Sequence, residues 1–421
     1  MLINSKYENL FFYKLPSILF VLIPFFLITG PLLSDLSVSL IAIIFLIYCL
    51  KKKNFSYFKR KYFYFFLAFW IYLVINSLIN NFNISSFGTS VVYVRYGIFI
   101  IAVVNLLHFN SKLIKNLFYC LLTCFTFLIL DGYFQYFTGA NILGWEKSSR
   151  ISSFFGEEKI LGSYLSRLWP IFFGAFILNF AKKNKIYILI ISIFILSEAL
   201  VFLSGDRSSF FYINLSAIFV IILSHKLLKL RLFTLLSSFL VLFLISMINP
   251  AAKDRVIDLT VKQMNIGGDQ DVGIYYFTKQ HTHHYITAYR MFLDNKILGV
   301  GLKNFRNLCN DNRYKVSNLS CSTHPHNTFI QVLVETGIIG LFFLLFAALY
   351  FTIFIVKHLI QKFKGKYFFS DFEICILSGI LIYLWPFVPT GNIFTNWLSI
   401  IMILNIPLII WSREEKQIES Q

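Results

Sequence analysis

Residues 15–53 read LPSILFVLIPFFLITGPLLSDLSVSLIAIIFLIYCLKKK. Two apolar segments, 15–33 and 36–50, flank Ser34 and Asp35, and three consecutive lysines follow the second segment. A helix needs roughly 20 apolar residues to cross the hydrocarbon core of a bilayer. The stretch therefore predicts two membrane-spanning helices joined by a tight connection, the second of them short.

Ten further apolar segments follow along the chain, which predicts about twelve membrane-spanning helices. Only 14% of the 421 residues are charged and 57% are hydrophobic, whereas soluble domains average roughly 25% charged residues. Lipid must therefore cover most of the surface, and we expect an all-α polytopic membrane protein. The further segments are residues 62–79, 90–107, 116–137, 162–181, 186–203, 208–224, 232–248, 327–356, 371–388 and 394–411.

Basic residues gather on alternate connections between these segments. Residues 51–61 hold six Lys and Arg residues, whereas the short connections 34–35, 80–89 and 389–393 hold none. An excess of Lys and Arg marks cytoplasmic loops. The alternation predicts a multi-pass membrane protein with both termini in the cytoplasm, and we expect the membrane to be the bacterial inner membrane. It also explains the net charge of +18 without nucleic acid as a partner.

The same orientation places the long connection 249–325 on the periplasmic face. We expect this loop to carry short helices, one of them near 285–293. The chain then divides into residues 1–248 with helices one to nine, the periplasmic loop at 249–325, and residues 326–421 with helices ten to twelve and a short cytoplasmic tail.

Two of the six cysteines, Cys309 and Cys321, lie in the periplasmic loop. The periplasm is oxidising, so cysteines there usually pair. A metal site is less favoured because the spacing is not Cys-x-x-Cys. The sequence predicts a Cys309–Cys321 disulfide, which would stabilise the fold by roughly 3 kcal/mol in the entropic model.

His324-Pro325-His326-Asn327 follows at the outer end of segment 327–356. Histidine is suited to proton transfer near neutral pH. A His-x-His pair can also bind zinc, but no Glu-x-x-His or Cys partner follows at ligand spacing, so we expect no metal. The structural alternative is that these histidines only cap a helix.

The short outer connection at residues 204–209, Ser-Gly-Asp-Arg-Ser-Ser, places Arg207 on the outer face, against the usual charge bias. A guanidinium fork matches phosphate oxygens, and Ser208 and Ser209 can offer hydroxyls and first-turn N–H groups. The alternative is that Arg207 pairs with Asp206 and terminates the helix.

Other polar residues stand out within or near the apolar segments. Arg95 and Arg167 fall within predicted spans, where charged residues usually face a cavity. The triplet at 281–284, His-Thr-His-His, is a candidate metal site, although a hydrogen-bonding or anion-facing surface is favoured. Gly299-Val-Gly301 is interpreted as a turn.

These motifs together resemble the O-antigen ligase and polymerase superfamily. The resemblance lies in Ser-Gly-Asp-Arg207, in Gly299-x-Gly301, and in the His-Pro-His-Asn block followed by Glu335-Thr-Gly337-Ile-Ile-Gly340. It implies a metal-independent glycosyltransferase without cofactors. The donor would be an undecaprenyl-diphosphate-linked glycan, and the acceptor a sugar hydroxyl on lipid A–core at the periplasmic face.

The resemblance also implies roles. Arg207 would hold the diphosphate, His326 would position or deprotonate the acceptor hydroxyl, and His324 would assist. Family members usually place a second Arg in the large loop four residues before an aromatic; here His281 precedes Tyr285 instead. The expected substrate-binding residues are Arg150, His281, His284, Arg290, Arg306 and Asn327.

Three alternatives remain open. An O-antigen polymerase and a protein O-oligosaccharyltransferase would use the same chemistry, and these motifs do not separate them from a ligase. A twelve-helix transporter belongs to another class, but the chain shows no similar halves and no helices broken at matching positions. The ligase is favoured.

Overall fold

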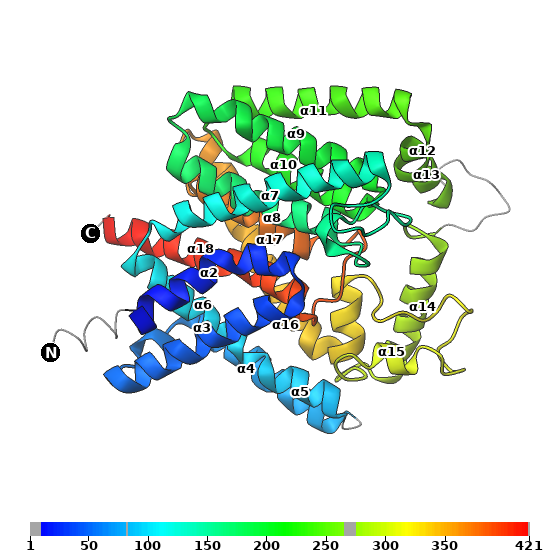
Figure 1. The fold of residues 1–421 in the computed structure, drawn as a ribbon. Coiled ribbons are helices and arrows are strands. Elements are labelled where there is room, and N and C mark those ends of the chain that lie inside the picture. The colour runs from blue at the N-terminus through cyan, green and yellow to red at the C-terminus, as the bar shows by residue number, and fades with distance from the viewer. Residues whose placement is uncertain (1–9, 81–82, 265–274, 420–421) are drawn as a thin grey trace.

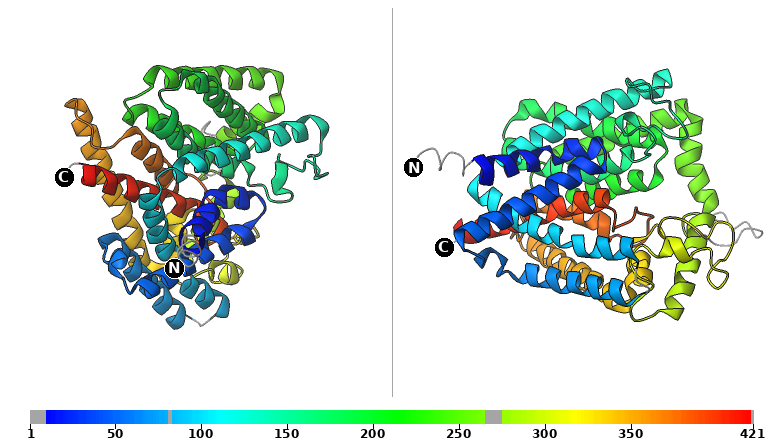
Figure 2. Two further views of the ribbon diagram at one scale, coloured as in Figure 1. Left: turned by 60° about the vertical axis from the view of Figure 1, so that its left-hand side comes forward. Right: turned by 60° about the horizontal axis from the view of Figure 1, so that its bottom comes forward.

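The computed structural model describes residues 10–80, 83–264 and 275–419. Within these ranges the chain is helical and has no β-strand, so the predicted all-α polytopic class is confirmed. The long helices run side by side, with the start of α2 and the end of α18 at one end of the bundle and the short helices α12 to α15 at the other (Figure 1). The right-hand view in Figure 2 shows the same division from another direction.

A helix occupies each of the twelve predicted segments; segment 90–107 is divided between two helices, and segment 15–33 extends into the helix that follows it. The long elements are α2 (Leu15–Ile28, preceded by a π-helical turn at Leu10–Lys14), α3 (Pro31–Lys52), α4 (Lys61–Ile79), α5 (Ile84–Val92), α6 (Val94–Phe109), α7 (Leu113–Thr138), α8 (Leu161–Phe180), α9 (Tyr187–Ser204), α10 (Arg207–Leu223), α11 (Leu228–Ile248), α16 (Thr328–Phe363), α17 (Asp371–Leu384) and α18 (Asn396–Glu419). Short 3-10 turns occur at Ser56–Phe58, Ser153–Phe155 and Asn184–Ile186.

Ten helices of the described chain are long and apolar enough to cross a membrane, when α5 and α6 are counted as one. This is two fewer than the predicted twelve. The two shorter helices are α10, with 17 residues, and α17, with 14 residues. Both pack against α8 inside the bundle.

The first connection lies elsewhere than predicted. The chain turns at Gly30, whose φ of 116° suits glycine, and Pro31 opens α3. Proline is favoured at the first helical position because its missing N–H has no helical partner there. Ser34 and Asp35 are therefore inside α3 and do not form the loop.

Helix α17 ends before the predicted boundary at residue 388. Pro386 and Pro389 follow it, and proline disfavours helix continuation. Residues 385–395 are irregular but largely buried, and the carbonyls of Pro386 and Val388 accept hydrogen bonds from Asn327 and Tyr212. Irregular backbone inside a membrane protein needs such internal partners.

Polar contacts join several predicted cytoplasmic connections at one end of the bundle. Arg60 pairs with Glu414 at 3.1 Å, Lys416 pairs with the buried Glu373, and Asp371 accepts the backbone N–H groups of His225 and Lys226 at 2.9 Å. The predicted cytoplasmic placement of residues 1–9 and 420–421 lies outside the described residues.

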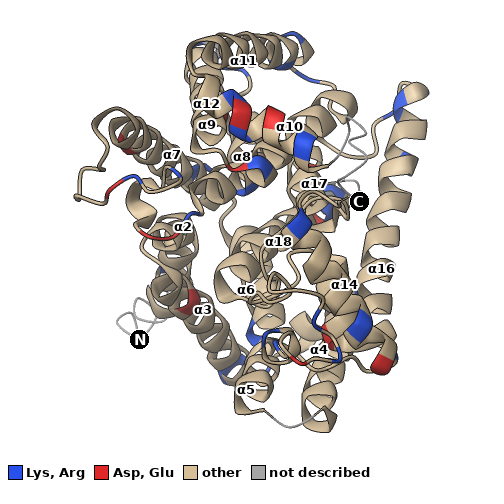
Figure 3. Cartoon of the chain, turned by 90° about the vertical axis from the view of Figure 1, so that its right-hand side faces the viewer, with Lys and Arg blue, Asp and Glu red and all other residues tan. Residues whose placement is uncertain are grey.

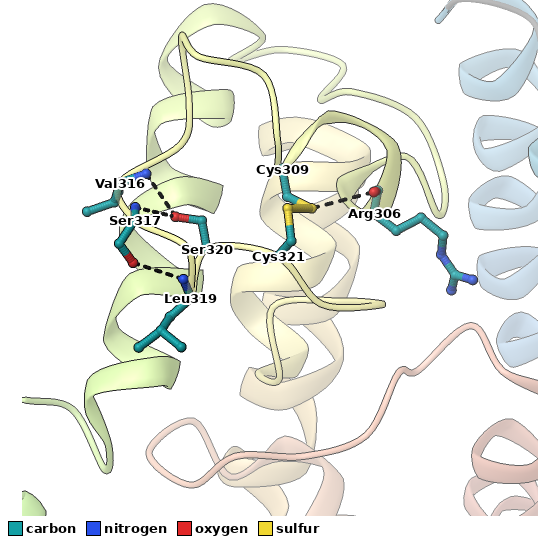
Figure 4. Close-up of a disulfide and its surroundings, with 7 residues drawn as sticks. All are labelled: Arg306, Cys309, Val316, Ser317, Leu319, Ser320 and Cys321. Carbon is teal, nitrogen blue, oxygen red and sulfur yellow. Dashed lines mark hydrogen bonds between the residues drawn. A yellow bond between two sulfur atoms is a disulfide. The ribbon is translucent and has the colours of Figure 1, made fainter.

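The connection between α11 and α16 contains α12 (Pro250–Lys253), a π-helical turn (Asp254–Asp258), α13 (Leu259–Gln263), α14 (Lys279–Asp294) and α15 (Phe305–Leu308). Residues 265–274 of the predicted loop lie outside the described chain. Figure 3 views the molecule from this end. The predicted disulfide is present: Cys309 and Cys321 are bonded, with their Cα atoms 5.1 Å apart (Figure 4). A small apolar cluster that includes Cys309 also contains Met291 and Phe305.

The Gly299–Gly301 turn docks onto a break in α16. Helix α16 departs from helical geometry at Gly337, with φ 64° and ψ −168°. The N–H groups of Val300 and Gly301 donate to the carbonyls of Val334 and Glu335, at 2.8 and 2.9 Å. A Cβ at Gly299 would lie 2.5 Å from the Gly337 nitrogen. The glycines are therefore required for this backbone contact.

Candidate functional site

The turn between α9 and α10 places Arg207 at the end of the bundle that carries α12 to α15. Gly205 ends α9 in the left-handed conformation, with φ 67°, and Asp206 caps α10 by accepting the N–H of Ser209. Both are favoured roles for these residue types. Arg207 is consequently the first residue of α10, exposed to partners from the loop.

Arg207 bonds to the loop and not to its neighbour Asp206. Its guanidinium donates to Thr260 at 3.2 Å and Gln263 at 2.8 Å, both on α13, and lies 5.4 Å from the ring centre of Phe277. The structure therefore does not contain the alternative Arg207–Asp206 pair.

The Ser208–Ser209 contribution differs from the expectation. The Ser209 hydroxyl donates to Asp206 at 2.8 Å, and its N–H is the group that Asp206 caps, at 3.3 Å. Because Asp206 already occupies these donors, Ser209 has neither group free for a phosphate.

Three arginines from separate segments converge here. Arg150 lies 3.9 Å from Asp206. Arg255 donates to the carbonyls of Gly205 and Ser149, at 3.4 and 2.9 Å. The positive charges of Arg150 and Arg255 both repel that of Arg207. We call Arg150, Arg207 and Arg255 the arginine cluster; it places three guanidinium groups around a single carboxylate.

Sequence reasoning missed Arg255. It belongs to the π-helical turn after α12, outside every recognised motif. The one available signal was an arginine shortly after a span, on the outer face, where basic residues are less common. Burial, and next the charge of Arg150, lower the pKa of Arg255, so the cluster would favour an anion.

Four imidazoles meet beside Arg207. The His326 ring centre lies 4.1 Å from that of His324 and 5.3 Å from those of His281 and His284. We call these four the histidine cluster. His281 also lies 5.9 Å from Phe277, the ring on which Arg207 stacks, which joins the two clusters.

The three histidines of α14 do not all lie on the same face of the helix. His281 and His284 are three positions apart and share a face, whereas His283 contacts Ser317 at 2.5 Å on another side. Among the described residues, no three His, Cys, Asp or Glu side chains stand in an arrangement that could hold a metal ion.

Burial keeps the histidine cluster uncharged. It lowers the pKa of His281 and of His326 to about 3 and that of His324 to about 4, and the neighbouring imidazoles add to the effect. The His284 pKa is also lowered, mainly by burial. Near neutral pH these side chains are therefore neutral hydrogen-bonding groups.

His324 and His326 differ in how their ring nitrogens are hydrogen-bonded. Nε2 of His324 lies 3.1 Å from the Thr390 carbonyl, which only accepts, so Nε2 donates and Nδ1 accepts from Thr323 at 2.9 Å. Both His324 nitrogens are thus occupied. His326 contacts Ser322 through Nε2 at 2.8 Å and has a φ of 58°, a left-handed conformation uncommon outside glycine.

The buried segment after α17 holds the histidine block in place. Thr390 donates its N–H to the His326 carbonyl at 2.9 Å, and its hydroxyl accepts from Arg167 at 3.0 Å. Arg167, only 2% exposed, lies 4.8 Å from the rings of Tyr212 and Tyr383. The intramembrane arginine noted in the sequence is therefore a support for the site.

The remaining residues that the sequence predicts for the site are Asn327, Arg290 and Arg306, and each has a different set of contacts. Asn327 caps α16 through Phe329 and Ile330 and donates to Pro386 at 2.6 Å, so both ends of its amide are engaged. Arg290 donates to the Lys315 carbonyl at 3.1 Å, on the disulfide loop. Arg306 is exposed, and its side chain points away from the disulfide (Figure 4); its charge acts on His324.

An apolar groove lies near the α9–α10 turn. It has a volume of about 560 Å³ and is lined by Phe202 and Phe210, which lie close to that turn in sequence, by Phe243 of α11, and by Lys253 and Ile257.

A known family matches the part of the chain that holds most of these residues. Residues 190–345 match the family model described as O-antigen ligase. The match contains the α9–α10 turn, Arg255 and the whole histidine cluster. No curated protein sequence matches the chain. The chain therefore carries, over residues 190–345, a domain of the O-antigen ligase family.

Proposed function

We propose that this protein transfers a glycan from an undecaprenyl-diphosphate-linked donor to a sugar hydroxyl at the periplasmic face of the inner membrane, and that the acceptor is lipid A–core. The observation that carries the proposal is the arginine cluster, which Phe277 joins to four imidazoles and which shares the region of the α9–α10 turn with an apolar groove. These are the features that a lipid-linked diphosphate donor and a reacting sugar would need.

The arginine cluster is proposed to bind the donor. Arg207 is proposed to bind the diphosphate because a guanidinium fork pairs with phosphate oxygens, with Arg150 and Arg255 adding positive charge. When the bond between the anomeric carbon and the diphosphate oxygen breaks, negative charge grows on that oxygen. Fixed positive groups stabilise such charge without reorganising.

His326 is proposed to serve the acceptor. The acceptor hydroxyl forms the new bond to the anomeric carbon and gives its proton to the His326 imidazole. Neutral His326 can accept a proton, whereas the nitrogens of His324 are already engaged. Donor binding should raise the low pKa of His326, because a nearby negative charge favours imidazolium.

Separate donor and acceptor defects would test these roles. In a reconstituted assay with purified lipid-linked donor, Arg207→Ala and Arg207→Lys should weaken donor binding and transfer, the latter because lysine lacks the fork. Arg313→Ala, which removes an exposed arginine paired with Asp311, is the matched control. Normal donor binding and turnover in Arg207→Ala would contradict the donor role.

Substitution of His326 should reduce transfer by about 10²–10⁴-fold while donor binding persists. His326→Asn is the preferred variant because asparagine tolerates the left-handed backbone but cannot take the proton. His283→Ala is the control on the same loop. Transfer at the wild-type rate in His326→Asn would mean that His326 is structural.

The glycolipids of a deletion strain would separate ligation from polymerisation. Loss of a ligase should remove every glycan-capped lipid A–core species and leave lipid-linked polymer. Retention of a single repeat unit on the core would instead identify a polymerase.

A further inference from the structure

A second basic site lies on the outer face, away from the arginine cluster. It is a cavity of about 230 Å³ between the α5–α6 junction, the turn after Gly301 and the start of α18. We call it the Lys303 cavity. Its lining is Gly88, Thr89, Val92, Tyr93, Arg95, Tyr96, Lys303, Phe394 and Asn396.

Lys303 places an ammonium group in the wall of this cavity. The group donates to Thr89 at 3.0 Å, and no other hydrogen bond between described residues involves it. An ammonium has three donors, so two remain for a ligand. Burial, followed by the charge of Arg306, lowers the pKa of Lys303; a bound anion would oppose both effects.

Arg95 supplies a second cation to the wall. Its guanidinium pairs with Asp35 at 2.5 Å and lies 5.0 Å from the Tyr96 ring. Its Nε is buried without a hydrogen-bond partner among the described residues. Asp35 pairs with Arg95. The negative charge that acts on Lys303 is that of Glu335, which among the described residues accepts no hydrogen bond from the Lys303 ammonium, so this ammonium is the better-placed cation for a ligand.

The backbone at Lys303 is held in an unfavourable conformation. Its φ is 58°, which costs a residue with a side chain free energy. The preceding turn is fixed on the α16 break by the Gly301–Glu335 hydrogen bond. Strained residues held by surrounding structure concentrate at functional sites.

One segment, residues 390–396, contacts both the Lys303 cavity and the histidine cluster. Phe394 and Asn396 line the cavity, and Thr390 donates its N–H to the His326 carbonyl at 2.9 Å. The charge of Arg306 also acts on both Lys303 and His324, and the Arg306 side chain points toward the pale blue helices of the N-terminal part (Figure 4). This segment therefore connects the cavity to the histidine cluster.

We infer that the Lys303 cavity binds a phosphate monoester on the acceptor glycan and so orients its hydroxyl toward His326. This inference rests on the proposed function and adds the chemical class of the acceptor. A phosphate monoester carries about −1.5 to −2 charges at pH 7 and three acceptor oxygens. That suits Lys303 with Arg306 nearby and the free donors in the wall.

A binding experiment tests the inference directly. The full chain in lipid nanodiscs is titrated calorimetrically with a core oligosaccharide that bears a phosphate monoester, with its phosphatase-treated form, and with inorganic phosphate. Lys303→Gln removes the charge, and Lys303→Arg retains it. Lys296→Gln is the matched control, an exposed lysine of the same loop.

Lys303→Gln should bind the phosphorylated oligosaccharide about 10–100-fold more weakly than the wild type, because it loses a charge-assisted hydrogen bond. Lys296→Gln and Lys303→Arg should stay within a few-fold, and the dephosphorylated form should bind all variants equally weakly. Unchanged affinity in Lys303→Gln would overturn the inference. So would inorganic phosphate binding as tightly as the oligosaccharide, which would indicate a site for the free ion.

Transfer measured on the same samples separates the two proposals. If the wild type transfers glycan and Lys303→Gln has unaltered acceptor KM and affinity, only the Lys303 inference fails. If the oligosaccharide binds in a Lys303-dependent manner but the wild type transfers nothing from the lipid-linked donor, the proposed function fails.

Discussion

Replacement of Gly337 by alanine tests whether the connection between α11 and α16 depends on the break in α16. The backbone at Gly337 has φ 64° and ψ −168°, a region essentially restricted to glycine, and strain of this kind costs of order 1–3 kcal/mol. An added Cβ would also overlap the Ile297 carbonyl, so the turn would have to move.

Displacement of the turn adds a second cost. It would break the hydrogen bonds of Val300 to Val334, of Gly301 to Glu335 and of Ile338 to Lys296, which are 2.8–2.9 Å long. At about 1 kcal/mol each, their loss brings the expected destabilisation to roughly 4–6 kcal/mol.

Gly365→Ala is the matched control, since Gly365 also has a positive φ, of 69°, but a Cβ there would meet nothing within 4 Å. Thermal unfolding in detergent should show a much larger decrease in Tm for Gly337→Ala. Trypsin should cleave faster at Lys296, Lys303 and Arg306 in that variant alone. Equal Tm and equal trypsin resistance in the two variants would refute the argument.

Three other results are expected. Replacement of both Cys309 and Cys321 by serine should destabilise the outer loop by roughly 3 kcal/mol, visible as a lower Tm and faster proteolysis, whereas Cys120→Ser should leave both unchanged. Three pKa values of the histidine cluster are held at about 3, 3 and 4, below roughly 6.5 in the unfolded chain. The stability that this provides should be complete above pH 6.5 and should decrease as the pH falls toward 4, by up to about 1.4 kcal/mol per pH unit for each histidine; a flat Tm between pH 8 and 4.5 would contradict it. Cysteines introduced at Thr323 and Ser208 should react with an impermeant reagent added from outside intact spheroplasts, and labelling of either one only after lysis would invalidate the orientation.

Much of the fold follows from composition and periodicity. The apolar segments were identifiable because a bilayer sets both their length and their polarity. The boundaries were less predictable. Ser34 and Asp35 looked like a loop because they are polar, yet Gly30 and Pro31 provided the stronger turn signal.

The site was predictable in its parts but not in its assembly. Arg207, His324 and His326 stand in recognisable motifs. Their meeting with His281 and His284 depends on the packing of α14 against α16, which local sequence does not specify. Asn327 could have been recognised as a helix cap from its position before Thr-Phe-Ile. Arg255 had no such pattern, because its place beside Gly205 follows from tertiary structure alone.

The shortness of α17 has a consequence for biogenesis. Its 14 residues extend about 21 Å at 1.5 Å per residue, less than the roughly 30 Å of the hydrocarbon core. Asp371 and Glu373 in its first turn make unaided partitioning into lipid still less favourable. We therefore expect the segment to enter the bilayer together with α16 or α18, after the earlier helices have formed a protein surface to receive it. Residues 385–395 would then be among the last to settle, and the histidine block that they hold would mature only when synthesis of the chain is nearly complete.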